Sequence, residues 1–144
     1  MTTILDVIRA PISPSNFSLP FWQATRDKKL LLQYCPRSRR YQFFPRPLSV
    51  FTARREIEWR ESSGAGVLYT FTIARLGPGG FAAAVPYAIG LIELAEGARI
   101  LGGIVNCPFE KLAIGMAMVP YWHPIGDGLH LCLFQPAPAA VPSV

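Results

Sequence analysis

The chain has 144 residues, of which 51% are hydrophobic and 16% are charged, so it is long enough for one packed domain with a small appendage. This composition excludes wholesale disorder, because disordered chains are poor in apolar residues and rich in charge. The 14 prolines and 12 glycines favour many turns and short strands over long helices.

The sequence shows neither a membrane-spanning stretch nor a secretory signal. The best apolar stretch, residues 82–94, is interrupted by Pro86 and Glu93 and is too short to span a bilayer. The N-terminal residues lack the basic region and apolar run of a secretory signal. The three cysteines are odd in number and widely spaced, which suits a reducing compartment better than a disulfide framework. We therefore expect a cytoplasmic protein with no membrane partner.

Positive charge is concentrated in one region. Residues 26–60 hold ten of the fourteen basic residues against three acidic ones, a net charge of +7, whereas the rest of the chain has a net charge of −2. A basic region on an otherwise nearly neutral protein suggests an anionic partner. A solvated surface that aids solubility explains the same composition equally well.

The first third of the chain predicts a small β arm. Residues 1–15 are expected to be an extended lead-in that is partly disordered. Ser18 is placed to cap a short helix with Pro20 in its first turn, and this helix should end near residues 27–29. Strands are predicted at 30–34 and 41–44. The arm, residues 16–56, has too few apolar residues for a core of its own, so a metal, a partner or the rest of the chain must hold it.

The remainder predicts a small barrel over residues 57–136, followed by a disordered tail, 137–144. Alternation of residues indicates a strand at 67–74, and we place four more strands between turn residues, at 87–94, 99–105, 113–122 and 129–134. One helical turn is expected at 108–112, between the third and fourth strands. This order matches the oligonucleotide/oligosaccharide-binding (OB) fold, a mainly β, five-stranded Greek-key barrel, although small barrels of other kinds remain open.

Five sequence blocks, read together, resemble a known family. They cover residues 20–35, 40–47, 66–75, 85–94 and 114–128. Over residues 17–136 the chain is similar to the thiolase-associated rubredoxin-like zinc-ribbon/OB-fold proteins, acyl-CoA-associated proteins of unknown function. The resemblance implies a non-catalytic accessory subunit that binds or channels acyl-CoA for a thiolase-type or aldolase-type partner enzyme, which supplies the reactive residues. A homo-oligomer is left open.

The chain departs from this family at the zinc site. A structural zinc ribbon needs two Cys-x2-Cys pairs, because Zn²⁺ prefers four soft, charged ligands in a tetrahedron. The corresponding positions here are Cys35, Ser38, Ser49 and Thr52. The glycines that the family has after each pair are replaced by Arg39 and Ala53. We therefore predict that the arm binds no zinc and that the protein has no cofactor apart from an acyl-CoA ligand.

Apolar packing is our hypothesis for what replaces the metal. The side chains expected to fill the arm are Phe43, Phe44, Val50 and Phe51. Burying one such side chain stabilises a fold by roughly 1.5–3 kcal/mol, so several together could partly offset the loss of zinc.

Nucleophilic and acid–base residues are interpreted as structural. Cys35 lies near several arginines, which would favour its thiolate, but no histidine or carboxylate lies close to it in the sequence. Cys107 and Cys132 are interpreted as small hydrophobic residues at strand ends. His123 and His130 are expected to be surface or partly buried barrel residues, and 126–128 to be a turn. We predict no catalytic residue.

Three interpretations of the basic arm remain. In the first, Arg39, Arg40 and Arg46 contact the phosphates of CoA, since guanidinium groups suit phosphate. The acyl chain would then lie against aromatic side chains of the set Trp22, Phe43, Tyr69, Phe71 and Phe81. In the second, the barrel binds single-stranded nucleic acid through the same residue types. In the third, the arginines dock onto an acidic face of the partner enzyme. The resemblance favours the first and makes nucleic acid the alternative.

Overall fold

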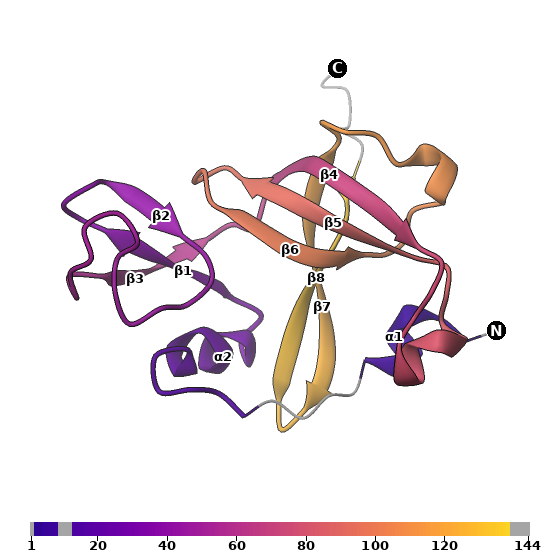
Figure 1. Ribbon diagram of the computed structural model, residues 1–144, viewed down its shortest axis with the longest axis horizontal. Helices are drawn as coiled ribbons and strands as arrows, with labels where there is room; N and C mark the ends of the chain where they lie inside the picture. Colours follow the sequence, from indigo (N-terminus) through magenta and orange to yellow (C-terminus); the bar gives the residue numbers. More distant parts are fainter. Residues whose placement is uncertain (1, 9–12, 139–144) are drawn as a thin grey trace, which may run out of the picture.

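A closed β-barrel and a three-stranded sheet make up the computed structural model, which describes residues 2–8 and 13–138. The arm contains α2 (Leu19–Thr25), β1 (Leu30–Cys35), β2 (Arg40–Gln42) and β3 (Glu58–Ser62). The barrel strands are β4 (Gly66–Ala74), β5 (Tyr87–Leu94), β6 (Arg99–Ile104), β7 (Ala117–Gly126) and β8 (Leu129–Pro136). Three further short helices are α1 (Ile4–Val7), η1 (Gly79–Ala83) and η2 (Phe109–Lys111). Figure 1 shows the arm sheet on one side of the barrel and α1 on the other.

The barrel has the predicted OB-fold order. Its strands follow each other as β4-β5-β6-β8-β7, and β7 pairs back onto β4 to close the ring. The neighbours are antiparallel except for β6 and β8, which meet as a parallel pair at Ile104 and Phe134. The helical turn expected between the third and fourth strands is η2. The mainly β fold class is therefore confirmed.

Buried apolar side chains from all five strands build the barrel core. In β5 every second residue is buried, from Ala88 to Leu94. The most deeply buried side chains of the barrel are Leu68, Ile92, Met118 and Phe134. Each is worth roughly 1.5–3 kcal/mol of transfer free energy relative to an exposed position. In β5 the residues at every second position therefore face the interior of the barrel.

The arm sheet has β1 at its centre, between β2 and β3. The helix at 19–25 and the strands at 30–35 and 40–42 agree with the sequence predictions. Two features were not predicted. β3 pairs along β1 from Leu30↔Ser62 to Tyr34↔Glu58, so residues 58–62, which we had placed in the barrel region, belong to the arm sheet. Ile4–Val7 form a helical turn inside the segment expected to be extended. Residues 9–12 and 139–144, where we expected more of the lead-in and the tail, lie outside the described residues.

Helix α2 joins the arm to the barrel. The backbone N–H of His130 donates to Thr25 Oγ1 at 3.1 Å, and His130 Nδ1 donates to the Thr25 carbonyl at 2.8 Å. The guanidinium of Arg26 donates to the carbonyl of Asp127 in the β7–β8 turn. Residues 126–128 therefore form the expected turn, and His130 is a partly buried structural residue. Among the described residues, none of the helices has the length and hydropathy needed to span a bilayer.

The arm is not filled by apolar packing, so that hypothesis was wrong in part. Phe44 and Val50 are 56% and 54% exposed, and only Phe43 and Phe51 are half-buried. The buried residues between β1, β2 and the following loop include polar ones: Gln33, Gln42 and Ser49. Polar side chains replace the expected apolar ones because the loop leaves many backbone groups that need hydrogen-bond partners.

Candidate functional site

The residues at the zinc-ligand positions lie on two similar loops. In the first, the N–H of Arg39 donates to the carbonyl of Cys35 at 2.8 Å, and in the second, the N–H of Ala53 donates to the carbonyl of Ser49 at 2.9 Å. Arg39 and Ala53 both have φ of 58°, the left-handed conformation that favours glycine. Both loops thus adopt a backbone shape that favours glycine, although neither residue is a glycine.

The Cys35 thiol is buried at the meeting point of these loops. The Ser38 hydroxyl first, and the Ser49 hydroxyl second, lower the pKa of Cys35 to about 7 against burial, which raises it. The residue is only 1% exposed, and no histidine or carboxylate is among its hydrogen-bond partners. A substrate cannot reach this thiol, so the geometry does not support a nucleophilic role.

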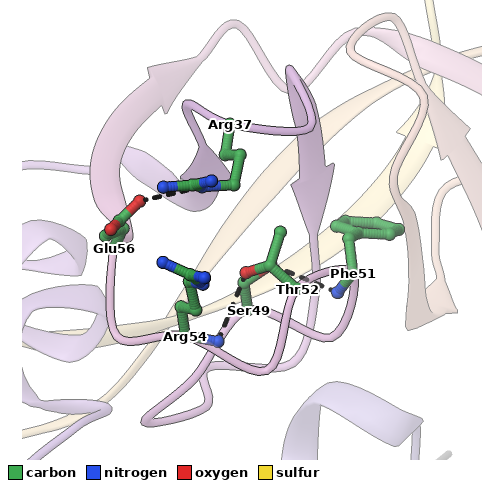
Figure 2. Close-up of polar contacts among 6 residues, drawn as sticks. All are labelled: Arg37, Ser49, Phe51, Thr52, Arg54 and Glu56. Atoms are coloured by element: carbon green, nitrogen blue, oxygen red, sulfur yellow. Dashed lines mark hydrogen bonds and ion pairs between the residues drawn. The ribbon is translucent and has the colours of Figure 1, made fainter.

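The donor set at these positions does not fit Zn²⁺. It offers one thiol and the hydroxyls of Ser38, Ser49 and Thr52, and neutral hydroxyls are poor ligands for a structural zinc ion. Thr52 Oγ1 already accepts a hydrogen bond from the N–H of Arg54, as Figure 2 shows. No group of three or more His, Cys, Asp or Glu side chains is placed to hold a metal within the described part of the chain.

An apolar groove lies where the arm meets the barrel. It has a volume of about 370 Å³ and is bounded by α2, by the segment 43–45 and by strands β6 and β8. Two of the predicted aromatic residues, Trp22 and Phe43, line it together. Phe21 lies between them, with ring centroids 5.1 Å from Trp22 and 5.7 Å from Phe43. We call this feature the junction groove.

Two exposed apolar side chains form the rim of the junction groove. Phe44 is 56% exposed, and Leu101 on β6 is 59% exposed. Sequence reasoning did not assign a binding role to either residue. The signal for Leu101 was present, because period-two alternation places it on the same outward face as Arg99. A large exposed apolar rim around a groove is typical of a protein or ligand contact.

The other predicted aromatic residues lie elsewhere. Tyr69 is on the outer face of β4, where Arg99 stacks over its ring at 3.7 Å. Phe71 packs against the buried core of the barrel. Phe81 lies in η1 near Tyr87 and beside α1, across the molecule from the arm (Figure 1). The structure therefore brings Trp22 and Phe43 together and does not bring the remaining three to them.

Several arginines of the arm already have partners. Arg37 pairs with Glu56 at 3.4 Å (Figure 2), and Arg60 pairs with Glu58 at 2.9 Å while stacking over Tyr34. Arg40 lies over the ring of Phe51 at 4.3 Å. Each of these three arginines is therefore engaged in a contact within the arm.

Four arginines in the arm have no side-chain partner among the described residues. They are Arg39, Arg46, Arg54 and Arg55, and all four are exposed. Arg46 directly follows Pro45, which lines the junction groove. These four arginines are the groups available to an external anion or an acidic surface.

The outer face of β5 and β6 is mainly aliphatic. Ile89, Leu91 and Leu101 point outward, and the charges on this face, Glu93 and Arg99, pair with each other at 2.9 Å. In nucleic-acid-binding OB folds this face carries unpaired basic residues and stacking aromatic residues. The face here is better suited to contact with protein or an aliphatic group than with phosphates and bases.

Comparisons with known proteins agree with this architecture. Residues 59–123 match the family model described as ChsH2, C-terminal OB-fold domain. In solved structures, the complex entitled Ltp2-ChsH2(DUF35) aldolase contains a chain that superposes on 88% of this one with a TM-score of 0.76 and 25% identity, over 98% of its own length.

Two curated relatives extend the likeness to the arm. A probable enoyl-CoA hydratase alpha subunit from Thermomonospora curvata is 30% identical over 81% of this chain, which spans only 37% of that subunit. A DUF35 domain-containing scaffold protein from Methanocaldococcus jannaschii is 35% identical over 66% of this chain and 69% of its own length. With this identity, coverage and barrel topology, the chain belongs to the family of DUF35 domain-containing scaffold proteins.

Proposed function

We propose that this chain is a non-catalytic scaffold subunit that docks onto a partner enzyme acting on acyl-CoA substrates, of thiolase or aldolase type. Support for the scaffold role comes from the names of its relatives and from the inaccessibility of Cys35. One similar protein is named a probable enoyl-CoA hydratase alpha subunit, and another belongs to a complex named an aldolase. Both names support a partner enzyme that acts on acyl-CoA. The chemistry is assigned to the partner because the described residues offer no accessible nucleophile–base pair.

The junction groove is the observation that carries this proposal. Its rim exposes Phe44 and Leu101 around an apolar groove, an arrangement typical of an interaction site. Arg46 directly follows Pro45 of the groove in the chain, and the aliphatic face of β5 and β6 continues from Leu101. An acidic, apolar surface of the partner would cover these groups. An acyl-CoA held between the two proteins would place its phosphates against the free arginines of the arm.

Affinity purification with matched variants tests the proposal. The tagged chain should recover a thiolase-fold or aldolase-type enzyme, identified by mass spectrometry from the native host. Leu101→Asp should reduce binding of that purified enzyme by at least about tenfold, because it buries an unpaired charge in an apolar contact. Leu76→Asp is the control, since Leu76 is 90% exposed but lies outside the groove. Equal binding by both variants, or turnover of an acyl-CoA by this chain alone, would contradict the proposal.

A further inference from the structure

Two glutamine side chains lie at the centre of the arm. Gln33 on β1 and Gln42 on β2 are directly opposite in the strand register and are 3% and 5% exposed. The side-chain amide of Gln42 donates from Nε2 to Gln33 Oε1 at 2.8 Å. A buried amide needs all of its polar atoms satisfied, so the remaining hydrogen bonds of the pair are informative.

Those remaining bonds all reach the loop that carries Ser49. Gln33 Nε2 donates to the carbonyl of Arg46, and the N–H of Arg46 donates to Gln33 Oε1, both at 2.8 Å. Gln42 Nε2 donates to the carbonyl of Leu48 at 3.0 Å, and the N–H of Val50 donates to Gln42 Oε1 at 2.8 Å. The two amides thus hold three residues of one loop against the β1–β2 hairpin.

This loop and this hairpin are the two parts that a ribbon zinc ion would join. Cys35 ends β1, and Ser49 lies between Leu48 and Val50, so any metal at these positions would hold the same loop against the same hairpin. We propose that the arm folds without metal, and that the Gln33–Gln42 pair is the clamp that fastens the second loop to the hairpin in place of zinc.

The clamp also positions one wall of the junction groove. Phe44 and Pro45 line the groove, and Arg46, the next residue, is bonded to Gln33 through both its N–H and its carbonyl. Gln33 and Gln42 are therefore positioning residues for this wall. The clamp itself is argued from contacts within the arm and does not depend on the identity of any partner.

Hydrogen exchange of individual amides tests the clamp. In Gln42→Leu, the Val50 N–H and the Leu48 carbonyl lose their partner, and the exchange of Val50 and Arg46 should accelerate by at least about tenfold, equivalent to about 1.4 kcal/mol of local stability. Gln23→Leu is the matched control, because Gln23 is exposed on α2 and should leave both amides protected. Unchanged exchange of Val50 in Gln42→Leu would overturn the clamp.

Metal measurements on the wild-type chain test the other half of the proposal and need no variant. Elemental analysis should find far less than one zinc per chain, and neither a chelator nor added Zn²⁺ should change the exchange of Val50. Cys35→Ser should also leave Val50 protected, because the Val50 N–H is bonded to Gln42 and not to Cys35. Stoichiometric zinc, with loss of arm protection on chelation, would show that a metal fastens the arm and would refute the proposal.

Discussion

At the scale of single residues, the two loops that carry Cys35 and Ser49 contain backbone strain. Arg39 and Ala53 adopt φ of 58°, and the left-handed conformation costs an L-residue roughly 1–2 kcal/mol relative to glycine. Each residue is held there by the hydrogen bond from its own N–H to Cys35 or Ser49. The shape of the loops is therefore imposed by the surrounding arm and not by the local sequence.

Ala53→Gly should relieve part of this strain. We expect the free energy of unfolding to rise by about 0.5–1 kcal/mol, since the gain is offset in part by the greater freedom of glycine in the unfolded chain. Urea denaturation measures the change. The control is Ala82→Gly, at an exposed residue of η1 without a positive φ, which should be neutral or destabilising. Equal effects at both sites would contradict this account.

The Cys35 thiol should make stability depend on pH. Its pKa is about 7 in the folded chain and 9.0 in an unperturbed thiol, so folding favours the thiolate. This contribution is fully present above pH 9 and is lost as the pH falls through 7. The melting temperature of wild type minus that of Cys35→Ser should therefore rise between pH 6 and pH 9. The melting temperature of wild type minus that of Cys132→Ala should show no such rise, because burial raises the pKa of Cys132 to about 12. A difference between wild type and Cys35→Ser that stays constant from pH 6 to pH 9 would disprove the effect.

At the scale of elements, the barrel depends on close approach between β4 and β5. Gly66 pairs with Leu94, and a Cβ at Gly66 would lie 2.4 Å from the carbonyl oxygen of Glu93. That neighbour is backbone and cannot move aside without separating the strands. A side chain at this position is therefore incompatible with the observed register.

Gly66→Ala should destabilise the barrel by about 1–3 kcal/mol, the usual cost of forcing atoms into a packed site. Thermal or urea unfolding would report the loss. Gly80→Ala is the control, because a Cβ there meets nothing within 4 Å and its φ is not positive. If the two variants unfold alike, the close approach at Gly66 is not what restricts the position.

Elements with clear periodicity could be predicted from the sequence, and others could not. β5 was predicted at its observed bounds because a short apolar run lies between Pro86 and the turn at 96–97. β3 was missed because Glu58–Ser62 is mostly charged and polar, and its pairing with β1 comes from tertiary contact. β7 begins later than predicted, at Ala117, because Gly115 has φ of 92° and breaks the extended chain.

The candidate site was predictable only in part for a related reason. Trp22 and Phe43 were identified as aromatic residues of the arm and meet in the junction groove. Phe44 and Leu101 lie far apart in the sequence, so no local pattern could place them on one rim. The Gln33–Gln42 clamp was also hidden, because a glutamine in a short strand has no sequence signature that distinguishes burial from exposure.

At the scale of the whole molecule, charge is separated from the barrel face that OB folds use most often. The free arginines Arg39, Arg46, Arg54 and Arg55 are all in the arm, whereas the face of β5 and β6 is aliphatic and its charges are paired. The phosphates of a single-stranded nucleic acid would contact the arm arginines, but its bases would not stack on the barrel. The distribution suits a partner that offers acidic and apolar groups in different places.

We therefore expect only weak binding of oligonucleotides. Affinity for a single-stranded oligonucleotide should be low at 50 mM salt and be lost by 200 mM, because it rests on a few phosphate contacts. Fluorescence anisotropy at both salt concentrations, with CoA and an acyl-CoA as competitors, measures this. Tight oligonucleotide binding that persists at 200 mM salt would favour the nucleic-acid alternative.

The hydrogen bonds between Thr25 and His130 affect how this fold could be reused in protein engineering. Because the arm helix is fastened to the β7–β8 hairpin by two hydrogen bonds and by Arg26, the arm and the barrel keep one angle to each other. A partner that contacts both the arm and the barrel therefore meets them at a fixed spacing. A barrel transplanted without the arm would lose this fixed spacing.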